Sequence, residues 1–357
     1  MSAISELFSS TILLLPRIRC ENYDGLNVLE GNNLKVIPLT CLPGSDFKRK
    51  MRFPYWFIKN IRTIISEIRS ADAVHAVIPG DIGMIGMLLA LFFRKRLFVR
   101  HCGNWLKPGT MADYFLKWAM EHFANERNIM FATGGGPNPP SEKNSSIRWI
   151  FATSLSKKEI DKLARKRDIL NRDIRLIIVC RQENDKGTLS VIKCMPHIHS
   201  RYPNVFFDIV GDGSSLSYFK KAAVDMNISK YIVFHGNVNH NTVKKLLDNA
   251  DLMCFPTNSS EGFPKAVHEA LSCGLPVITT PISVLPFLIG TGCGIIVKDT
   301  SPNTLSDAVC RLISNPDEYR AMSEQALKTA VEYSLESWRD TIGDCLKASW
   351  GQLNSGL

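Results

Sequence analysis

The stretch SSEGFPKAVHEALSCGLPVIT, residues 259–279, carries the most information about the fold of this chain. Gly262 allows a sharp backbone turn, and Pro264 suits the first position of a helix, where its missing N–H is not needed. We therefore expect a loop, then a helix over residues 264–272, then a short strand over residues 276–279. The start of such a helix presents free N–H groups and attracts phosphate or a partly charged oxygen.

The same alternation of short apolar strands and helical patterns surrounds this stretch. It predicts α/β domains built on parallel sheets, with doubly wound topology in the second half. Expected strands in the second half are Ile174–Cys180, Val205–Val210, Tyr231–His235, Leu252–Phe255, Pro276–Thr279 and Gly294–Val297. Expected strands in the first half are Ala73–Ile78, Leu97–Arg100, Ile129–Thr133 and Ile147–Ala152.

Length and composition exclude several classes of protein. The chain has 357 residues, which leaves room for two domains with a core each. Its longest purely apolar run, residues 82–93, is shorter than the roughly 20 residues that span a bilayer, and we expect neither a transmembrane helix nor a signal peptide. The ten cysteines lie at least fourteen positions apart, which predicts reduced thiols in a cytoplasmic protein and no zinc site.

Positive charge is concentrated in the first half. Residues 1–170 contain 25 Lys and Arg against 15 Asp and Glu, whereas residues 171–357 contain 18 against 19. The densest segment, FKRKMRFPYWFIKNIR at residues 47–62, interleaves six basic residues with aromatic ones. This pattern is typical of a membrane-surface segment or a nucleic-acid patch, and no RNA- or DNA-binding module supports the second.

Two interpretations of this segment stay open. One is contact with an anionic membrane surface through Lys48, Arg49, Lys50, Arg52 and Trp56. The alternative is a basic turn over residues 48–52, followed by an amphipathic helix that starts beyond Pro54 and buries Trp56 in its own domain.

Four loops of the second half follow predicted strands and carry polar residues. They are Arg181–Gly187, Gly211–Ser215, His235–Val238 and Ser259–Lys265. Because ligands of open parallel sheets bind beyond the carboxyl ends of the strands, we expect these loops to form one site. Arg181 and Lys186 supply two cations, and Glu261 and Glu269 supply two carboxylates.

Together these segments resemble the donor-binding half of retaining, family-four glycosyltransferases of the GT-B fold. The resemblance covers Ile174–Tyr333 and extends through Gly274-Leu275-Pro276-Val277-Ile278. It implies an α/β protein with two Rossmann-like doubly wound domains facing a cleft. The expected domains are an acceptor-binding domain over residues 1–170, a nucleotide-sugar donor domain over residues 171–335, and a C-terminal helix over residues 336–357 that crosses back to the first domain.

The resemblance also implies roles for the charged residues. Arg181 and Lys186 bind the diphosphate and neutralise the leaving group, as cations do where bond cleavage leaves negative charge. Glu269 holds the ribose hydroxyls, Glu261 holds the donor sugar, and His101 lies near that sugar. For His101, a purely structural histidine is the alternative.

The resemblance further assigns main-chain and pocket positions around the donor. The main chain at Gly262, Phe263, Pro264 and Lys265 cradles sugar hydroxyl and phosphate. Asn237 and Val238 lie near the nucleobase. Gly211 and Gly213 let the backbone approach the nucleotide, with a plain turn as the alternative.

The sequence thus predicts a metal-independent enzyme without a cofactor that transfers a sugar with retention of configuration. The donor is a UDP- or GDP-linked sugar, and the acceptor is a saccharide or a lipid-linked saccharide of surface polysaccharide or glycolipid biosynthesis. We expect a cytoplasmic protein at the inner face of the membrane. The alternatives are a hydrolase that uses Glu261 and Glu269, an epimerase of the same fold, and a non-catalytic nucleotide-sugar-binding scaffold.

The first half fits the resemblance less well than the second. Members of this family begin with a strand and a glycine-rich loop within the first twenty residues, and only Thr11–Pro16 is typical of such a strand here. Either the acceptor loop is built differently, or the usual first strand and loop are missing.

Overall fold

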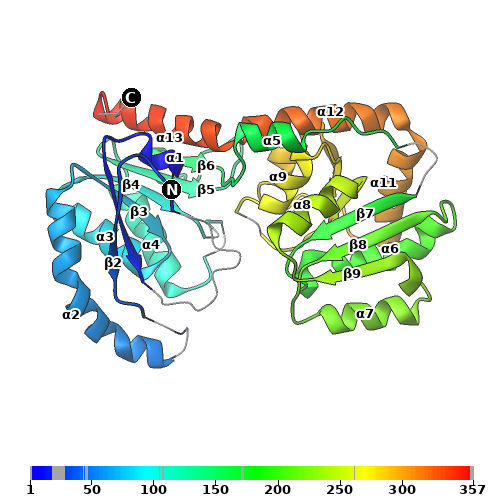
Figure 1. Cartoon of the computed structure of the whole chain (residues 1–357), viewed down its shortest axis with the longest axis horizontal. Coiled ribbons are helices and arrows are strands. Elements are labelled where there is room, and N and C mark those ends of the chain that lie inside the picture. Colours follow the sequence, from blue (N-terminus) through cyan, green and yellow to red (C-terminus); the bar gives the residue numbers. More distant parts are fainter. Residues whose placement is uncertain are drawn as a thin grey trace. The chain divides into compact units, whose positions relative to one another are not determined.

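The computed structural model describes residues 2–17, 29–42, 44, 47–103, 105–106, 108–169, 173–260 and 262–353, apart from the side chains of residues 47 and 48. These residues form two compact units (Figure 1). The first unit comprises Met1–Thr133, Asn138–Ile150 and Arg339–Leu357, and the second comprises Gly134–Pro137 and Phe151–Trp338.

The first unit contains a four-stranded and a two-stranded parallel sheet. The larger sheet has the strand order β3-β4-β5-β6 and the smaller one pairs β1 with β2. The strands are β1 (Thr11–Pro16), β2 (Leu34–Leu39), β3 (Ala73–Ile78), β4 (Arg96–His101), β5 (Asn128–Thr133) and β6 (Ile147–Ile150). The helices are α1 (Ser2–Ser5), α2 (Phe47–Ser70), α3 (Asp81–Phe92) and α4 (Met111–Phe123).

Clusters of apolar side chains pack the described elements of this unit against one another. Met87 of α3 and Met120 of α4 pack on Val99 and Met130 of the larger sheet. The second cluster joins β2, α2 and α3. A strand is therefore present at Thr11–Pro16, while the chain directly after it, residues 18–28, lies outside the described residues.

Helix α2 begins at Phe47 and continues through Pro54, so the expected basic turn over residues 48–52 is wrong. Proline costs one backbone hydrogen bond within a helix. The packing of the residues around it offsets that loss, because the Phe53 ring stacks near Trp56 and Phe57 at centroid distances of 5.8 and 6.3 Å. An amphipathic face stabilises a helix more than the propensity of any one residue.

The second unit is a doubly wound domain with a six-stranded parallel sheet in the order β12-β11-β10-β7-β8-β9. The strands are β7 (Ile174–Val179), β8 (Val205–Val210), β9 (Ile232–Gly236), β10 (Leu252–Phe255), β11 (Val277–Thr279) and β12 (Gly294–Ile296). The helices are α5 (Lys157–Leu163), α6 (Thr188–His199), α7 (Leu216–Asp225), α8 (His240–Asn249), α9 (Lys265–Ser272), α10 (Leu285–Ile289), α11 (Pro302–Ser314) and α12 (Pro316–Glu332), with 3-10 turns η1 (Asn184–Lys186) and η2 (Ser229–Tyr231).

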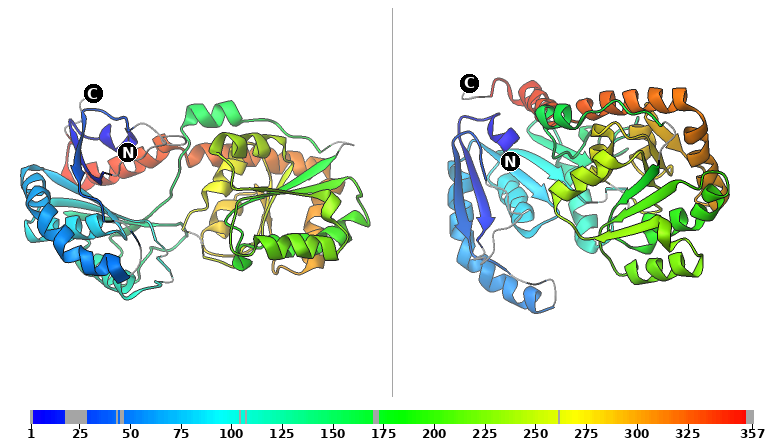
Figure 2. Two further views of the ribbon diagram at one scale, coloured as in Figure 1. Left: turned by 60° about the horizontal axis from the view of Figure 1, so that its bottom comes forward. Right: turned by 45° about the vertical axis from the view of Figure 1, so that its right-hand side comes forward.

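The helices of the second unit form two groups (Figures 1 and 2). Helix α6 contacts α7 and α11, whereas α9 contacts α5, α8 and α12. The strand order reverses between β7 and β10, because the chain proceeds from β7 to β8 on one side and from β10 to β11 on the other. Ligands of open α/β sheets bind at such a switch point, so we expect a ligand site at the loops after β7 and β10.

The boundary between the units lies after Ile150 rather than after residue 170. Leu155 and Ile160 are buried in the core of the second unit, which is why α5 belongs to it. Arg167 strengthens the attachment, because its guanidinium donates to the carbonyl oxygens of Cys273 at 2.9 Å and Ala250 at 2.8 Å.

Helix α13 (Leu335–Trp350) starts in the second unit and ends in the first. Trp350, in its last turn, packs edge-on against Phe98 of β4 at 6.2 Å, and its indole N–H donates to the carbonyl of Arg127 at 3.1 Å. From Arg339 onward the chain therefore belongs to the core of the first unit.

Two further expectations concern the membrane and the cysteines. Within the described parts of the chain, no helix is both long and apolar enough to cross a bilayer. The nine cysteines of the described residues are free thiols, and Cys194, Cys254, Cys273, Cys293 and Cys310 are buried. Cys20 lies outside the described residues.

Candidate active site

The loop between β7 and α6 carries the two predicted cations. Arg181 lies on the surface directly after the strand, while Lys186 ends the 3-10 turn η1 and is buried. Gly187 follows with a φ of 89°, and a Cβ at this position would lie 2.3 Å from the carbonyl oxygen of Pro256. The turn that holds Lys186 therefore packs tightly on the loop after β10, and only glycine fits at position 187.

Gln182 holds this loop in place through hydrogen bonds of its side chain, and the sequence analysis did not identify it. Its side chain is completely buried. Its amide nitrogen donates to the carbonyl oxygens of Cys180 and Val210, both at 3.0 Å, and its amide oxygen accepts from the Thr188 hydroxyl at 2.8 Å. One side chain thus ties together the ends of β7 and β8 and the start of α6.

Gly211 and Gly213 are required by close packing of this loop on its neighbour. Gly211 has a φ of 115°, and a Cβ there would lie 1.9 Å from the carbonyl oxygen of Cys180. A Cβ on Gly213 would lie 2.4 Å from the carbonyl oxygen of Gln182. Close packing of the backbone within the protein therefore explains why both positions are glycine, independently of what a bound nucleotide requires.

Glu183 makes a second link between the same two loops. Its carboxylate accepts from the backbone N–H of Ser214 at 3.1 Å and from the Ser214 hydroxyl at 2.5 Å. These two hydrogen bonds lower the pKa of Glu183 below its ordinary value. The carboxylate is thereby held as an acceptor, and it keeps the glycine-containing loop in register with the loop of Arg181.

Thr257 joins the loop of Lys186 to the loop that leads into α9. Its buried hydroxyl donates to the carbonyl of Asp185 at 3.2 Å and accepts from the N–H of Ser259 at 3.0 Å. The N–H of Asn258 also donates to the Asp185 carbonyl, at 2.8 Å. The two loops that flank the switch point of the sheet are thus hydrogen-bonded to each other.

Helix α9 begins one residue later than expected. Pro264 is its N-cap rather than its first helical residue, and the Pro264 carbonyl accepts from the N–H groups of Val267 at 3.0 Å and His268 at 3.2 Å. The side chain of Phe263 is buried between Phe151 and Tyr333, so only its main chain can face a ligand. Glu261 lies outside the described residues.

Glu269 lies in the middle of α9 and is buried. Burial raises the pKa of its carboxyl group above the ordinary value, and His240, Lys244 and Lys265 oppose this rise through their charges. Nδ1 of His240 is 3.9 Å from Oε1 of Glu269. The start of α8 thus places a polar ring beside a buried acceptor, at the edge of the sheet where β9 and β10 end.

The residues expected near a base follow β9. Gly236 has a φ of 66°, and its carbonyl accepts from the N–H of Gly211 at 2.8 Å. This bond aligns the loop after β9 with the loop after β8. Asn237 is exposed, whereas Val238 packs against the core of the unit.

The family of the second unit follows from its sequence as well as from its fold. Residues 159–329 match the model of the glycosyl transferases group 1. Over these residues, which lie in the second unit, the chain is similar to the glycosyl transferases group 1. The match covers α9, the loops after β7, β8, β9 and β10, and every described predicted site residue except His101.

Curated relatives agree with this family. The chain is 28% identical over 184 residues to an uncharacterized glycosyltransferase of Methanocaldococcus jannaschii, over 50% of this chain and 47% of the relative. It is 28% identical to a GDP-mannose-dependent monoacylated alpha-(1-6)-phosphatidylinositol monomannoside mannosyltransferase of Corynebacterium glutamicum, over 53% of this chain and 51% of the relative. The chain thus spans about half the length of these curated relatives.

Solved structures show that the whole chain has the GT-B fold. HepE of Anabaena in complex with UDP superposes with a TM-score of 0.70 at 14% identity, over 94% of this chain and 99% of HepE. WaaG, a glycosyltransferase involved in lipopolysaccharide biosynthesis, superposes with a TM-score of 0.59 at 16% identity, over 90% and 88% of the two chains. Two Rossmann-like units with parallel sheets are the architecture that the sequence predicts.

His101 belongs to the first unit, not to the group 1 domain. It ends β4, is 2% exposed and packs edge-on against Trp105 at 5.3 Å. Burial lowers the pKa of its ring below the ordinary value. Its Nδ1 has no hydrogen-bond partner among the described residues. One polar atom of this buried ring is thus unused within the described structure.

The described residues of the group 1 domain contain no cluster of side chains that could bind a metal ion. Within the described ranges, no three His, Cys, Asp or Glu side chains form such a cluster. The domain carries a surface arginine and a buried lysine on the loop after β7, and a buried glutamate in the middle of α9, the helix that follows β10. This set suits an anionic ligand that also carries hydroxyl groups.

Proposed function

We propose that this protein transfers a sugar from a nucleotide diphosphate sugar to a saccharide or lipid-linked acceptor with retention of configuration. One observation carries the proposal. The loop that bears Arg181 and Lys186 is hydrogen-bonded through Asp185 and Thr257 to the loop that opens α9, the helix that bears Glu269. Cations for a diphosphate and an acceptor for hydroxyl groups thus lie on two linked loops.

The cations supply the electrostatics that the reaction needs. Cleavage of the sugar–phosphate bond leaves negative charge on the diphosphate, and positive groups fixed in advance stabilise that charge without reorganisation. Gly187 and Gln182 fix the backbone on either side of η1, so the loop that bears Arg181 and Lys186 keeps its shape before the donor arrives. We propose that these cations replace a metal ion, and that the reaction uses no cofactor.

Buried Glu269 is the proposed ligand of the ribose hydroxyls. An ionised carboxylate accepts two hydrogen bonds from neighbouring hydroxyl groups. Because the Glu269 carboxylate is buried in α9 and desolvated, hydrogen-bond donors stabilise it, and the hydroxyl groups of a ribose are such donors. We propose in addition that Glu261 holds hydroxyls of the donor sugar, that the main chain from Gly262 to Lys265 faces the phosphate, and that Asn237 and Val238 contact the base.

The donor is proposed to be linked to UDP or GDP. HepE structures contain UDP, glucose or UDP-glucose, and two relatives are described as GDP-mannose-dependent. The acceptor class is proposed from the same relatives, several of which act on phosphatidylinositol glycolipids, while another acts in amylovoran biosynthesis. We place the reaction in surface polysaccharide or glycolipid biosynthesis, at the cytoplasmic face of the membrane.

The retained alternatives make different demands on the site. A hydrolase needs two carboxylates about 5 to 9.5 Å apart across the glycosidic bond and has no use for Arg181 and Lys186. A nucleotide-sugar epimerase binds the same donor but transfers nothing to an acceptor. A scaffold binds the donor and leaves it intact.

The test is a donor screen followed by product analysis. Thermal shifts are recorded with UDP, GDP, ADP and CMP on the wild type, Arg181→Ala and Glu269→Gln, since a ligand at 100 times its Kd stabilises a protein by about 2.7 kcal/mol. We expect one nucleoside diphosphate to shift the melting of the wild type only. The sugar of that donor is then supplied with lipid-linked and free saccharides, and the anomeric configuration of the product is read by NMR.

Each result of this test has a clear meaning. A product with the donor's configuration supports the proposal, an inverted product contradicts retention, and free sugar without transfer favours the hydrolase. Donor binding without any turnover favours the scaffold. His101→Ala and Glu261→Gln complete the set, because turnover that survives both changes removes these two residues from the proposed site.

A further inference from the structure

Helix α4 (Figure 1) presents a stripe of large apolar side chains at the surface of the first unit. The α4 stripe consists of Met111, Tyr114, Phe115 and Trp118, which are 84%, 58%, 43% and 53% exposed. At about 100° of rotation per residue, these positions fall within one sector of about 100° around the helix. The opposite side of α4 packs in the core of the unit through three buried residues, Leu116, Ala119 and Met120.

The charged side chains of α4 are paired within the first unit. The Asp113 carboxylate closes the capping box at the start of the helix. The Lys117 ammonium donates to the carbonyl of Trp105 at 3.3 Å and lies 5.0 Å from the centre of the Trp105 ring. Glu121 accepts from the Ser141 hydroxyl at 2.9 Å. The α4 stripe itself contains no Lys, Arg, Asp or Glu, so it is an uncharged surface.

Aromatic contacts along α4 hold the stripe in one arrangement. The Trp118 ring lies 5.9 Å from the Phe115 ring, and it stacks on the His122 ring at 5.5 Å with an interplanar angle of 12°. Trp118 also meets the edge of Phe123 at 6.3 Å. A side chain that its neighbours already hold loses little conformational freedom when a partner covers it, which lowers the entropic cost of association.

The composition of the α4 stripe is typical of the centre of a protein–protein interface. Tyr, Trp, Phe and Met are enriched there, whereas Lys, Glu and Asp are depleted. Trp and Tyr are also common among the few residues that contribute most of the binding energy. Contiguous exposed apolar patches of this kind mark interaction sites. Charge and area then decide which partner fits the stripe.

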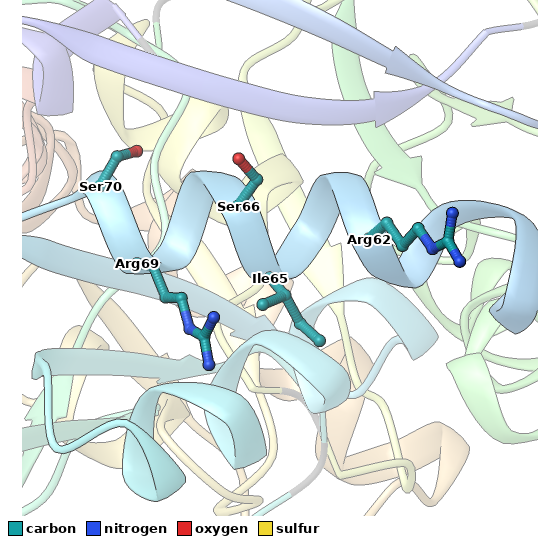
Figure 3. A pocket seen from close by; sticks show the side chains of 5 residues that line it. All are labelled: Arg62, Ile65, Ser66, Arg69 and Ser70. Carbon is teal, nitrogen blue, oxygen red and sulfur yellow. The ribbon is translucent and has the colours of Figure 1, made fainter.

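Charge distinguishes the α4 stripe from the exposed face of α2. The apolar side chain of Tyr55 on α2 lies among exposed basic residues. Arg62 and Arg69 line a shallow pocket on this helix together with Ile65, Ser66 and Ser70 (Figure 3). A two-fold contact sets a surface against its own copy, so two copies of the basic α2 face repel each other. Two copies of the uncharged α4 stripe do not.

The interpretation of α2 as a membrane contact is wrong for Trp56, which belongs to the core. Trp56 is 4% exposed, and its indole N–H donates to the carbonyl of Thr40 at 2.6 Å. Arg49 forms an ion pair with Asp81 at the start of α3, so it serves the packing of α2 on α3. The other residues of that interpretation are two exposed ones and one whose side chain lies outside the described residues, namely Lys50, Arg52 and Lys48.

The area of the α4 stripe suits a contact between two copies of the chain. Scaled by their exposed fractions, its four side chains offer roughly 300 to 500 Å² in each copy. A pair of stripes therefore buries roughly 600 to 1,000 Å² of apolar surface. Because about 57% of an interface is apolar, the whole contact covers roughly 1,000 to 1,700 Å². Specific, stable interfaces bury about 1,200 to 2,000 Å², so the two ranges overlap.

We propose that two copies of this chain associate through the α4 stripe, in a two-fold contact between antiparallel helices. With the axis between Tyr114 and Phe115, Met111 of one copy lies against Trp118 of the other. A two-fold contact uses the same patch on both copies, so each apolar side chain of the stripe meets another. Pairs of aromatic rings and contacts between a thioether and a ring are both favourable.

Other partners fit the α4 stripe less well. Nucleic acids and anionic surfaces are bound through Lys and Arg, and the stripe has neither. A different protein with an apolar face is the remaining alternative, and it leaves the isolated chain monomeric. The oligomeric state of the purified chain therefore separates the two cases.

The experiment is sedimentation velocity of the full chain between about 1 and about 100 μM, a range that covers the weakest dissociation constants of interfaces of this size. Tyr114→Lys and Phe115→Glu are compared with the wild type, alone and as an equimolar mixture. Each variant sets like charges against each other across its own two-fold axis. In the mixture, the new lysine of one copy faces the new glutamate of the other, so the charges attract.

Matched controls carry the same changes of charge on another helix. Tyr218→Lys and Val224→Glu alter exposed side chains of α7 in the second unit, which are 55% and 61% exposed. Tyr114→Gln removes the ring without adding charge. Lysine, glutamate and glutamine are good helix formers, so the helices persist in all these variants. Thermal melting of each variant reports whether it is folded.

We expect the wild type to sediment as a dimer in the upper part of this concentration range. Tyr114→Lys and Phe115→Glu each weaken self-association at least about 100-fold, because like charges within an interface are strongly unfavourable. Tyr114→Gln weakens it about tenfold, as loss of a central aromatic side chain does. The equimolar mixture of the two charge variants recovers the dimer. Both α7 variants sediment like the wild type.

Three results overturn the proposal. The first is a wild type that is monomeric at every concentration, and the second is a dimer that folded α4 variants leave unchanged. The third is a mixture that stays monomeric although both charge variants are folded, because it contradicts the antiparallel two-fold register. Sedimentation requires no donor or acceptor, so none of these results bears on the proposed transfer activity.

Discussion

The Thr188 hydroxyl donates to Oε1 of Gln182 at 2.8 Å, and both side chains are completely buried. This bond fixes the orientation of the Gln182 amide, whose nitrogen then reaches the carbonyls at the ends of β7 and β8. The proposed diphosphate-binding loop is therefore shaped by a pair of neutral side chains that are completely buried.

Gln182→Leu is expected to destabilise the protein and to weaken donor use. The Cys180 carbonyl and the Thr188 hydroxyl lose this partner, while the Val210 carbonyl keeps the N–H of Cys180 at 3.1 Å, and each unsatisfied buried group costs about 1 to 3 kcal/mol. Displacement of the loop raises the donor KM at least about tenfold, because small misplacements of binding groups are costly. Melting temperature and steady-state kinetics are measured together, with Thr188→Val and the double variant completing a cycle. Additive losses in that cycle contradict the coupling of the two residues.

Gly211→Ala is expected to destabilise the protein by at least about 1 to 3 kcal/mol. The new Cβ lies 1.9 Å from the carbonyl oxygen of Cys180, so the two loops must separate, and overpacking of this kind has that cost. Gly86→Ala in α3 is the matched control, because nothing lies within 4 Å of its Cβ. In a helix interior, alanine in place of glycine stabilises by about 0.5 to 1 kcal/mol. Thermal melting of the two variants is expected to shift in opposite directions.

Lys186→Ala is expected to lower kcat by about 10²- to 10³-fold, the usual effect of removing one group that stabilises transition-state charge. Lys193→Ala, on the exposed side of α6, removes the same charge from the same helix region and serves as the control. Steady-state rates with the donor found by the screen measure the difference. Equal rates for the two variants mean that charge near α6 acts only at long range.

Glu269 is expected to make donor binding depend on pH. Its pKa is raised by burial, and hydroxyl groups of a ribose need the ionised form as acceptor. Donor affinity is therefore present above the raised pKa and is lost as the pH falls through it, at a pH higher than the ordinary 4.5 of a glutamate. Calorimetric titrations of the nucleotide between about pH 4 and pH 8 measure this change.

The same residue opposes stability at neutral pH. A glutamate whose pKa is raised in the folded state favours folding when protonated; this contribution is fully present below the unfolded pKa and is lost as the pH rises through the raised pKa of the folded state. Glu269→Gln is therefore expected to melt at the same or a higher temperature than the wild type at pH 7 while it loses nucleotide binding. A lower melting temperature at pH 7 indicates that Glu269 is instead held by its neighbours for structural reasons.

Trp56→Ala and Tyr55→Ala test which face of α2 belongs to the core. Trp56 is buried, and truncation of a buried aromatic side chain costs about 3 to 5 kcal/mol. Tyr55 is 72% exposed, and its truncation is expected to change stability by no more than about 0.5 kcal/mol. Thermal melting of the two single variants suffices, and similar melting temperatures contradict the assignment of faces.

Much of the second unit could be predicted from the sequence, because local patterns encode its strands and helices. Residues 259–279 alone predict a loop, a helix and a strand, and the structure contains α9 and β11 there. That Arg181 lies near the carboxyl edge of the sheet also follows from sequence, because its loop comes directly after a strand of a parallel sheet.

Other features could not be read locally because they depend on residues far apart in the chain. The Thr257 hydroxyl donates to the carbonyl of Asp185, 72 positions away, and no sequence pattern around either residue predicts this hydrogen bond. For the interleaved basic and aromatic segment, the sequence left open whether Trp56 is buried or contacts a membrane, and the structure shows that it is buried. Whether Trp56 or Tyr55 faces outward depends on where β2 and α3 pack.

The sequence by itself determined the α/β class, the family of the second unit and the residue types at its loops, because hydrophobic period, glycine, proline and charge are local properties. Only the tertiary structure decided that Gln182 and Thr257 hold those loops, that Gly211 and Gly213 are needed by backbone contact, and that Tyr55 rather than Trp56 is exposed. These facts arise where separate strands and helices meet, and burial and hydrogen-bond partners exist only once they have met.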